Sequence, residues 1–115
     1  MVNEMAPRPH NSGHYTIEAS ATSQFEQHIR AICGLPLGST NLKSPAVMIN
    51  ILGDGQGKHL RGVDKLLEVP GLYLHLYGKE QSGHRRKIGH FTVLRDSADE
   101  AIKDALSAKK NLRWI

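Results

Sequence analysis

The chain has 115 residues and a mass of 12.7 kDa, which suffices for one compact core and excludes a complete multi-domain enzyme. No apolar run approaches the ~20 residues that span a bilayer, so we expect no membrane partner. Fifteen Lys and Arg residues against eleven Asp and Glu residues give a formal charge of +4, which favours an anionic partner.

The first zone of the chain, residues 1–38, opens with a short extended end and continues into a loop. Pro7 and Pro9 fix their own φ angles and push the residues before them out of the helical region. Gly13 permits a tight bend a few residues later. Residues 7–14 are therefore predicted to form a structured loop.

A helix is predicted near residues 22–33, after this loop. Ser23 and Glu26 have the spacing of a capping box, and Gly34 stands where a helix end often has a glycine. The apolar residues of this segment fall on one helical face: Phe25, Ile29 and Ile32. Cys33, the single cysteine, excludes an intrachain disulfide and fits a reducing compartment, so we expect a cytoplasmic protein.

The second zone, residues 39–115, begins with a linker rich in Pro, Gly, Ser and Asn. The apolar segment Ala46–Leu52 is typical of a mostly buried strand, and a Gly-Asp-Gly turn follows it. The next apolar residues have the spacing of a helical face: Val63, Leu66 and Leu67. Pro70 limits that helix to a short one.

Two more strands and a terminal helix complete this zone. In Leu72–Tyr77 leucines alternate with polar-tipped residues, as in a strand with one buried face, and Ile88–Leu94 follows after a loop. Ser97 and Glu100 form a second capping box before a helix with one apolar face: Ala98, Ala101, Ile102, Ala105 and Leu106. The expected fold class is α+β, with a small twisted, mainly antiparallel sheet and flanking helices.

Polar and charged side chains crowd the first loop and the segment before it. Arg8 can grip a phosphate or carboxylate with two parallel hydrogen bonds, and Asn11 and Ser12 can donate further ones. Asn3 and Glu4 offer oxygen ligands that suit Mg²⁺ bridging phosphates. The alternative is a polar surface loop whose side chains cap their own backbone.

His10 and His14 are four residues apart, the spacing at which two histidines of a helix can bind zinc. Pro9 and Gly13 oppose a helix here, and no third ligand is evident. We therefore favour no zinc site. Two other histidines are expected to be packing or surface groups: His28 and His75.

Basic residues concentrate in and beside the loop between the last two strands: Lys79, His84, Arg85, Arg86, Lys87 and His90. Such a loop can neutralise a phosphate, although many basic hairpin loops are simply solvated. Two Phe, three Tyr and one Trp offer little surface for stacking nucleic-acid bases. We therefore expect no nucleic-acid partner.

Several blocks of the sequence resemble one enzyme family. Residues 3–14 and 22–32 closely resemble the end of the ATP-grasp domain of N5-carboxyaminoimidazole ribonucleotide synthase, the ATPase subunit of phosphoribosylaminoimidazole carboxylase. Residues 74–80 and 86–90 resemble the small C-terminal domain of the same family. With residues 47–53, the resemblance covers nearly the whole chain in the right order.

The resemblance implies that residues 1–38 end an ATP-grasp domain and that residues 39–115 form the small C-terminal domain. It implies a purine-biosynthesis ligase that carboxylates 5-aminoimidazole ribonucleotide. The reaction uses ATP, Mg²⁺ and bicarbonate and releases ADP and phosphate. The family also suggests a homodimer.

Residue roles follow from the same resemblance. Asn3 and Glu4 match the family's nucleotide contacts, with Glu4 as a Mg²⁺ ligand. The implied catalytic residues are Arg8, His10 and Asn11. The implied substrate-binding residues are these three together with Ser12, Lys79 and Arg86.

The sequence departs from the family pattern in two ways. Residues 82–85 replace an Arg-Pro pair, which leaves open whether Arg85 or Arg86 meets the substrate phosphate. The chain also begins at the family's second Mg²⁺ carboxylate, so we expect the missing N-terminal portion as a partner and an inactive fragment without it. The alternatives are a non-catalytic anion-binding or interaction module derived from such an enzyme, and a non-specific nucleic-acid binder.

Overall fold

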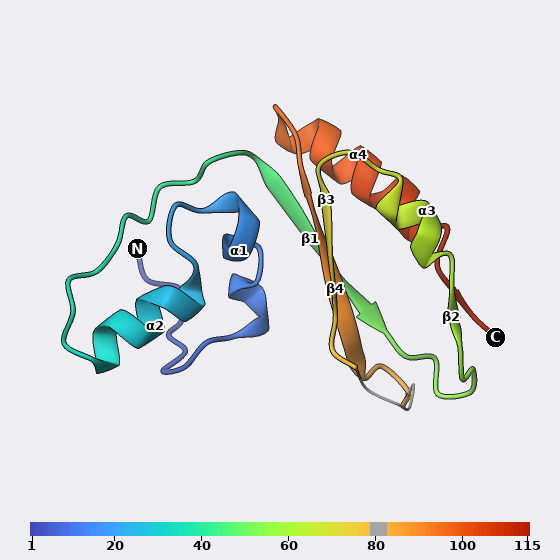
Figure 1. Cartoon of the computed structure of the whole chain (residues 1–115), viewed down its shortest axis with the longest axis horizontal. Coiled ribbons are helices and arrows are strands. Elements are labelled where there is room, and N and C mark those ends of the chain that lie inside the picture. The colour runs from blue at the N-terminus through green and yellow to red at the C-terminus, as the bar shows by residue number, and fades with distance from the viewer. Residues whose placement is uncertain (79–82) are drawn as a thin grey trace. The chain divides into compact units, whose positions relative to one another are not determined.

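The computed structural model describes residues 1–78 and 83–115 (Figure 1). The chain forms two compact units, unit 1 (Met1–Ser44) and unit 2 (Pro45–Ile115). Helices and an antiparallel sheet are both present, so the predicted α+β class is confirmed.

Unit 1 extends to Ser44, beyond the expected boundary at residue 38. The Ala21 amide donates a hydrogen bond to Asn41 O at 2.8 Å, and the Lys43 amide donates to Ala19 O at 2.6 Å. These bonds hold the end of the linker on unit 1. Whether this division is also the boundary between two domains stays a prediction.

Unit 1 contains a 3-10 turn and two helices: η1 (Asn11–Gly13), α1 (Thr16–Ala19) and α2 (Gln24–Ile32). The predicted helix near residues 22–33 is confirmed as α2. The Ser23 hydroxyl accepts a hydrogen bond from the Glu26 amide at 3.1 Å, and Gly34 has a φ of 68° after the helix. The expected cap and end of the helix are therefore both present.

The segment before η1 is neither helix nor strand. The four-residue α1 was not predicted, because it is too short to show a periodic pattern. Thr16 joins α1 to its neighbours: its hydroxyl donates to Gly13 O at 2.5 Å and accepts from the Gln24 amide at 2.9 Å. A single hydroxyl thus connects η1, α1 and α2.

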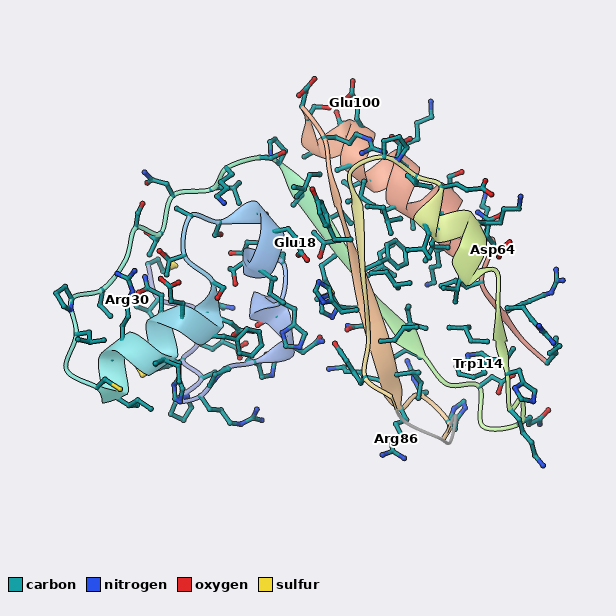
Figure 2. All side chains as sticks on the ribbon, viewed as in Figure 1. Glu18, Arg30, Asp64, Arg86, Glu100 and Trp114 are labelled. Atoms are coloured by element: carbon teal, nitrogen blue, oxygen red, sulfur yellow. The ribbon has the colours of Figure 1, made fainter. Side chains whose placement is uncertain are left out.

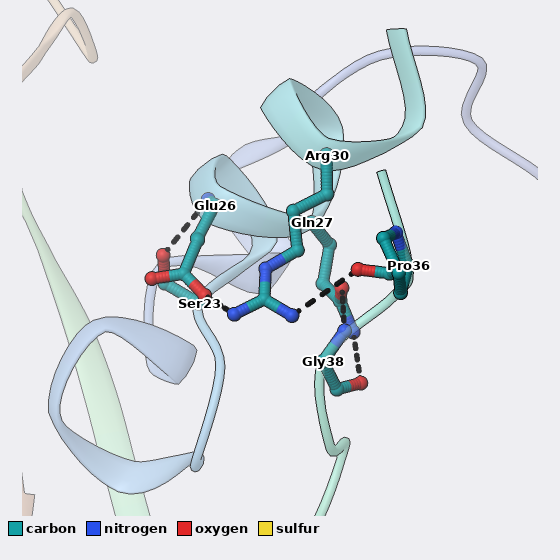
Figure 3. Close-up of polar contacts among 6 residues, drawn as sticks. All are labelled: Ser23, Glu26, Gln27, Arg30, Pro36 and Gly38. Carbon is teal, nitrogen blue, oxygen red and sulfur yellow. Dashed lines mark hydrogen bonds and ion pairs between the residues drawn. The ribbon is translucent and has the colours of Figure 1, made fainter. Parts of the chain in front are cut away.

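Helix α2 also holds the segment that follows it (Figure 3). The Gln27 side chain donates to Gly38 O at 2.7 Å and accepts from the Gly38 amide at 2.8 Å. Arg30 donates to Pro36 O at 3.2 Å and forms an ion pair with Glu26 at 2.7 Å. The apolar face of α2 remains exposed, by 41% at Phe25, 54% at Ile29 and 67% at Ile32.

Unit 2 is built on a three-stranded antiparallel sheet with the strand order β1–β4–β3. Close to the predicted ranges, its strands are β1 (Ala46–Leu52), β3 (Leu72–Leu76) and β4 (Lys87–Leu94). The predicted antiparallel pair of the last two strands is confirmed, since Leu74 pairs with Phe91 and His75 with His90. On the other edge of β4, Ile49 of β1 pairs with Phe91.

Helices α3 (Val63–Leu67) and α4 (Ala98–Lys109) cover one face of this sheet (Figure 1). The buried core consists of Ile51, Leu66, Phe91, Val93, Ala105 and Ala108. The Ser97 hydroxyl accepts a hydrogen bond from the Glu100 amide at 3.2 Å, which confirms the predicted cap of α4. Among the described residues, none of the helices has the length and apolar character needed to cross a membrane.

The buried stripe of α4 differs from the predicted apolar face and consists of Ala101, Ala105 and Ala108. Ala98 is exposed, and Ile102 and Leu106 are 46% and 52% exposed, so only part of the predicted apolar face is buried. Each of the two large residues follows a buried alanine by one position, which rotates it about 100° around the helix axis. Only small side chains fit where α4 approaches the sheet closely.

A second, two-stranded sheet pairs β2 (Leu60–Arg61) with β5 (Arg113–Trp114). Neither strand was predicted, because two residues cannot show an alternating pattern. The Trp114 indole N–H donates to Leu52 O at 2.8 Å, so the ribbon is tied to the end of β1.

Candidate active site

The loop that follows Pro7 lines an open pocket of unit 1 with a volume of about 500 Å³. Arg8, His10 and Ser12 contribute to its lining, together with side chains of α2. Asn11 is half-buried and does not line the pocket. The structure therefore brings together three of the predicted substrate-binding residues.

His10 caps the loop that carries it. Its Nδ1 accepts a hydrogen bond from the Ser12 amide at 3.2 Å and lies 3.0 Å from the Ser12 hydroxyl. The alternative in which loop side chains cap their own backbone therefore holds for this nitrogen. His10 Nε2 makes no hydrogen bond to a described residue, which leaves it for a ligand.

Gln24, the first residue of α2, holds the backbone of the same loop. Its Oε1 accepts from the His10 amide at 2.9 Å, and its Nε2 donates to His10 O at 2.8 Å and lies 2.9 Å from His14 Nδ1. A Cβ at Gly13 would collide with the Gln24 carboxamide, so a side chain at this position would displace Gln24 from these hydrogen bonds. Sequence reasoning missed Gln24, because its partners lie ten and fourteen residues away and no local pattern marks it.

The remaining candidates of unit 1 are exposed. Arg8 Nη1 donates to Pro9 O at 3.2 Å, a contact within the loop itself. Asn3 and Glu4 lie in the segment without helix or strand, and their side chains bond to no other described residue. These side chains are accessible to a ligand.

His14 packs within unit 1. Its ring stacks on Phe25 with centroids 5.6 Å apart, and its Nδ1 faces Gln24 Nε2. Of the pair considered for zinc, His10 Nδ1 therefore contacts Ser12 of the loop, and His14 Nδ1 contacts Gln24 of α2. Among the described residues, no group of three or more His, Cys, Asp or Glu is placed to hold a metal ion.

The basic loop of unit 2 leads into β4, and one of its predicted residues, Lys79, lies outside the described residues. The Arg85 amide donates to Gly53 O at 2.9 Å, and the Gly53 amide donates to Arg86 O at 2.8 Å. Gly53, the residue after β1, thus holds the backbone of both arginines. Arg85 has a φ of 58°, and Arg86 is exposed and projects beyond the end of the sheet (Figure 2).

A cluster on the sheet of unit 2 was not predicted as a unit: His75, Tyr77 and His90. The Tyr77 hydroxyl lies 2.7 Å from His90 Nδ1, and the imidazole rings of His75 and His90 stack with centroids 4.6 Å apart. His90 is only 2% exposed. Burial raises the pKa of the Tyr77 hydroxyl above its ordinary value. His75 packs against its cross-strand neighbour, in line with the packing role expected for it.

Two family models match the chain. The model described as the phosphoribosylaminoimidazole carboxylase C-terminal domain matches residues 46–104, more than half of the chain. The ATP-grasp domain model matches residues 1–25. The two matches follow each other in the predicted order.

Curated relatives carry the same family names. An N5-carboxyaminoimidazole ribonucleotide synthase of Bacillus subtilis is 52% identical over 104 residues, which cover 90% of this chain and 27% of the relative. A phosphoribosylaminoimidazole carboxylase of Schizosaccharomyces pombe is 52% identical over 106 residues, which cover 87% of this chain and 19% of the relative. The chain therefore spans about a quarter or less of these relatives.

Solved structures agree with these matches. N5-carboxyaminoimidazole ribonucleotide synthetase from Thermotoga maritima has a TM-score of 0.90 and 59% identity, covering 98% of this chain and 32% of that one. The Aspergillus clavatus enzyme, solved with ADP and 5-aminoimidazole ribonucleotide, has a TM-score of 0.79 and 38% identity, covering 89% of this chain and 28% of that one. The chain therefore belongs to the family of N5-carboxyaminoimidazole ribonucleotide synthases, the ATPase subunits of phosphoribosylaminoimidazole carboxylase.

Proposed function

We propose that the chain supplies part of the active site of a ligase that carboxylates 5-aminoimidazole ribonucleotide. In this reaction, ATP transfers its terminal phosphoryl group to bicarbonate, giving carboxyphosphate and ADP. The exocyclic amine of the ribonucleotide then forms a bond to the carboxyl carbon, and phosphate leaves. The observation that carries the proposal is the pocket of unit 1 with Arg8 and His10, because it lies in and beside the segment that matches the ATP-grasp model.

Arg8 and its neighbours suit anionic reactants. The exposed Arg8 guanidinium can pair with a phosphoryl or carboxyl group as negative charge develops there. We assign His10 Nε2, Asn11 and Ser12 to contacts with the aminoimidazole substrate and the carboxyl group. Because Gln24 holds the His10 backbone on both sides, the loop keeps its donors in place before the substrate arrives.

We assign Asn3 and Glu4 to the nucleotide and its Mg²⁺. The Glu4 carboxylate is exposed and bonds to no described residue, and it is the hard oxygen donor that Mg²⁺ prefers. When bound, Mg²⁺ neutralises charge on the phosphate groups. One carboxylate is an incomplete ligand set for Mg²⁺. We therefore assign the other Mg²⁺ ligands to the part of the relatives that this chain does not span.

The ribonucleotide phosphate is assigned to Lys79 and Arg86. The exposed side chain and anchored backbone of Arg86 support its part of the assignment. We further propose that the chain turns over substrate only together with the missing portion of the enzyme, that the complete protein is a homodimer, and that it works in the cytoplasm.

A fusion tests this proposal. The chain is joined to the N-terminal portion of the Bacillus subtilis relative at the position where the match begins. We expect ADP release that requires both 5-aminoimidazole ribonucleotide and bicarbonate, and none from the chain alone. A folded fusion that binds ATP but releases no ADP would overturn the catalytic proposal and favour a non-catalytic anion-binding module.

A further inference from the structure

The two-stranded ribbon of unit 2 places two arginines directly opposite each other. Arg61 of β2 pairs with Arg113 of β5, and Leu60 pairs with Trp114. Like charges at opposite positions of an antiparallel pair destabilise it. Besides these two residue pairs, backbone hydrogen bonds join the ribbon at His59 and Ile115: the His59 amide donates to Ile115 O at 3.0 Å, and the Ile115 amide donates to His59 O at 2.9 Å. The ribbon therefore holds two like charges together at a cost that its backbone hydrogen bonds must offset.

No carboxylate of the described residues forms an ion pair with the two arginines. Four basic side chains of the ribbon and its approach form no ion pair with a described residue: Lys58, His59, Arg61 and Arg113. Asp54, four residues before Lys58, accepts hydrogen bonds from the Gln56 amide at 2.9 Å and the Gly57 amide at 2.8 Å instead. Asp64, at the start of α3, forms no ion pair either.

A pocket of about 350 Å³ lies beside these charges. Lys58, His59 and Arg61 contribute its basic lining. Its apolar lining includes Val63, Leu76, Ile88 and Trp114. Figure 2 shows Trp114 beside β2. The pocket thus combines unpaired positive charge with an aromatic and aliphatic wall.

We propose that this pocket binds a small organic phosphate that carries a planar group, the chemistry of a mononucleotide. The phosphate lies between Lys58 and Arg61, where it relieves the repulsion between Arg61 and Arg113. The planar group packs on Trp114 and the aliphatic wall. This site is separate from the proposed carboxylation site, since neither the loop at residues 7–14 nor Arg86 lines it.

The single tryptophan of the chain is the reporter, because Trp114 lines the pocket. The 115-residue chain is titrated with adenosine 5′-monophosphate while tryptophan fluorescence is followed. We expect a saturable change that inorganic phosphate or adenosine alone produces only at higher concentration, and that weakens as KCl is added. No saturable change, or an equal response to inorganic phosphate, would overturn the proposal.

Variants locate the bound phosphate. Arg61→Gln and Lys58→Gln should each weaken adenosine monophosphate binding by about tenfold, since each removes a charge-assisted hydrogen bond. Lys103→Gln is the matched control, an exposed lysine of α4 outside the pocket, and it should leave binding unchanged. If Arg61→Gln binds the nucleotide like the original chain, the phosphate is elsewhere and the proposal is wrong.

Arg113→Gln separates binding from stability. Without ligand it should raise Tm, because it removes the opposed charge. It should also reduce the further rise in Tm that adenosine monophosphate causes in the original chain. A lower Tm without ligand would show that the opposed arginines stabilise the ribbon, which would overturn the proposal. None of these measurements requires carboxylation activity, so their outcome does not decide whether the proposed function is correct.

Discussion

At the scale of single residues, α2 uses two glutamines in the same way. The Gln24 carboxamide binds both the N–H and the C=O of His10, and the Gln27 carboxamide binds both groups of Gly38. A carboxamide has one acceptor and one donor group side by side, so it can bind the N–H and the C=O of one residue at the same time. Gln24 and Gln27 therefore provide a matched pair of substitutions.

Gln24→Ala should loosen the loop around His10. The substitution removes two hydrogen bonds to the His10 backbone and should cost about 1–2 kcal/mol of local stability. Amide hydrogen exchange should become faster at His10 and at Gly13, whose amide donates to His10 O. Gln27→Ala should speed amide exchange at Gly38 and leave the exchange rate at His10 unchanged. Faster exchange at His10 in Gln27→Ala would show that the effect is not specific to Gln24.

Arg8 carries the most direct prediction about activity. In the fusion enzyme, Arg8→Ala should lower kcat by about a hundredfold, if the guanidinium stabilises charge in the transition state. Arg30→Ala is the control, since the Arg30 side chain bonds to Glu26 and Pro36 and does not line the pocket. Unchanged kcat in Arg8→Ala, with a loss of thermal stability alone, would remove Arg8 from the active site.

Asp54 makes stability depend on pH. Two backbone hydrogen bonds hold the pKa of the Asp54 carboxyl below its ordinary value of 3.8. The bond from the Gln56 amide has the larger effect, and the bond from the Gly57 amide comes next. The unfolded chain binds this proton at higher pH than the folded chain does. The stabilisation is therefore complete above pH ~4 and disappears as the pH falls through the lowered pKa.

Asp54→Asn tests this sign, because asparagine keeps the side-chain acceptor and loses the charge. Urea unfolding at several pH values should show the variant less stable at pH ~6 and equal to the original chain at pH ~2. An unchanged deficit at low pH would show that the charge of Asp54 is not the source of the effect.

At the scale of elements, α4 packs through small residues. Ala101 and Ala105 have no exposed surface, while their neighbours Ile102 and Leu106 are about half exposed. Alanine has no side-chain atoms beyond Cβ, so the helix backbone lies close to Phe91 and Val93 of the sheet. A larger side chain at position 105 has no space to occupy.

Ala105→Leu should therefore destabilise unit 2 by about 1–3 kcal/mol through overpacking. Leu106→Ala, at the next position on the exposed side, should change the free energy of unfolding by about 0.5 kcal/mol or less. Denaturant unfolding followed by Trp114 fluorescence measures both. Equal effects of the two substitutions would show that the alanine stripe does not face the core.

At the scale of the whole molecule, the two units differ in what they bury. Unit 2 has a core of six buried residues, whereas Ala19 is the one buried hydrophobic residue in residues 1–44, all of which are described. Unit 1 instead depends on side-chain hydrogen bonds such as those of Thr16 and Gln24. It should open with a lower free energy than the sheet of unit 2.

Hydrogen exchange compares the two units directly. Amides of α2 should exchange faster than those of β4, because α2 leaves Phe25, Ile29 and Ile32 exposed. In the fusion with the N-terminal portion of the Bacillus subtilis relative, α2 should gain protection while β4 stays as it was. Equal protection of α2 with and without that portion would show that nothing in it covers this face.

The sequence by itself determined the elements whose signals are local. Ser23 with Glu26 and Ser97 with Glu100 marked two helix starts, and the apolar and alternating patterns marked the three long strands. It also identified the family through its motifs, and with them Arg8 and His10, which the structure then placed around one pocket. Capping and periodicity act within a few residues, so they are visible before folding.

Only the tertiary structure decided the rest. The hydrogen bonds between Gln24 and the His10 backbone join residues fourteen positions apart, and the bond from Trp114 to Leu52 joins residues 62 positions apart. Neither leaves a local pattern in the sequence. The same holds for the order β1–β4–β3, the alanine stripe of α4 and the opposed arginines of the ribbon. These features depend on which distant surfaces meet, and burial and shape set that outcome only when the whole chain packs.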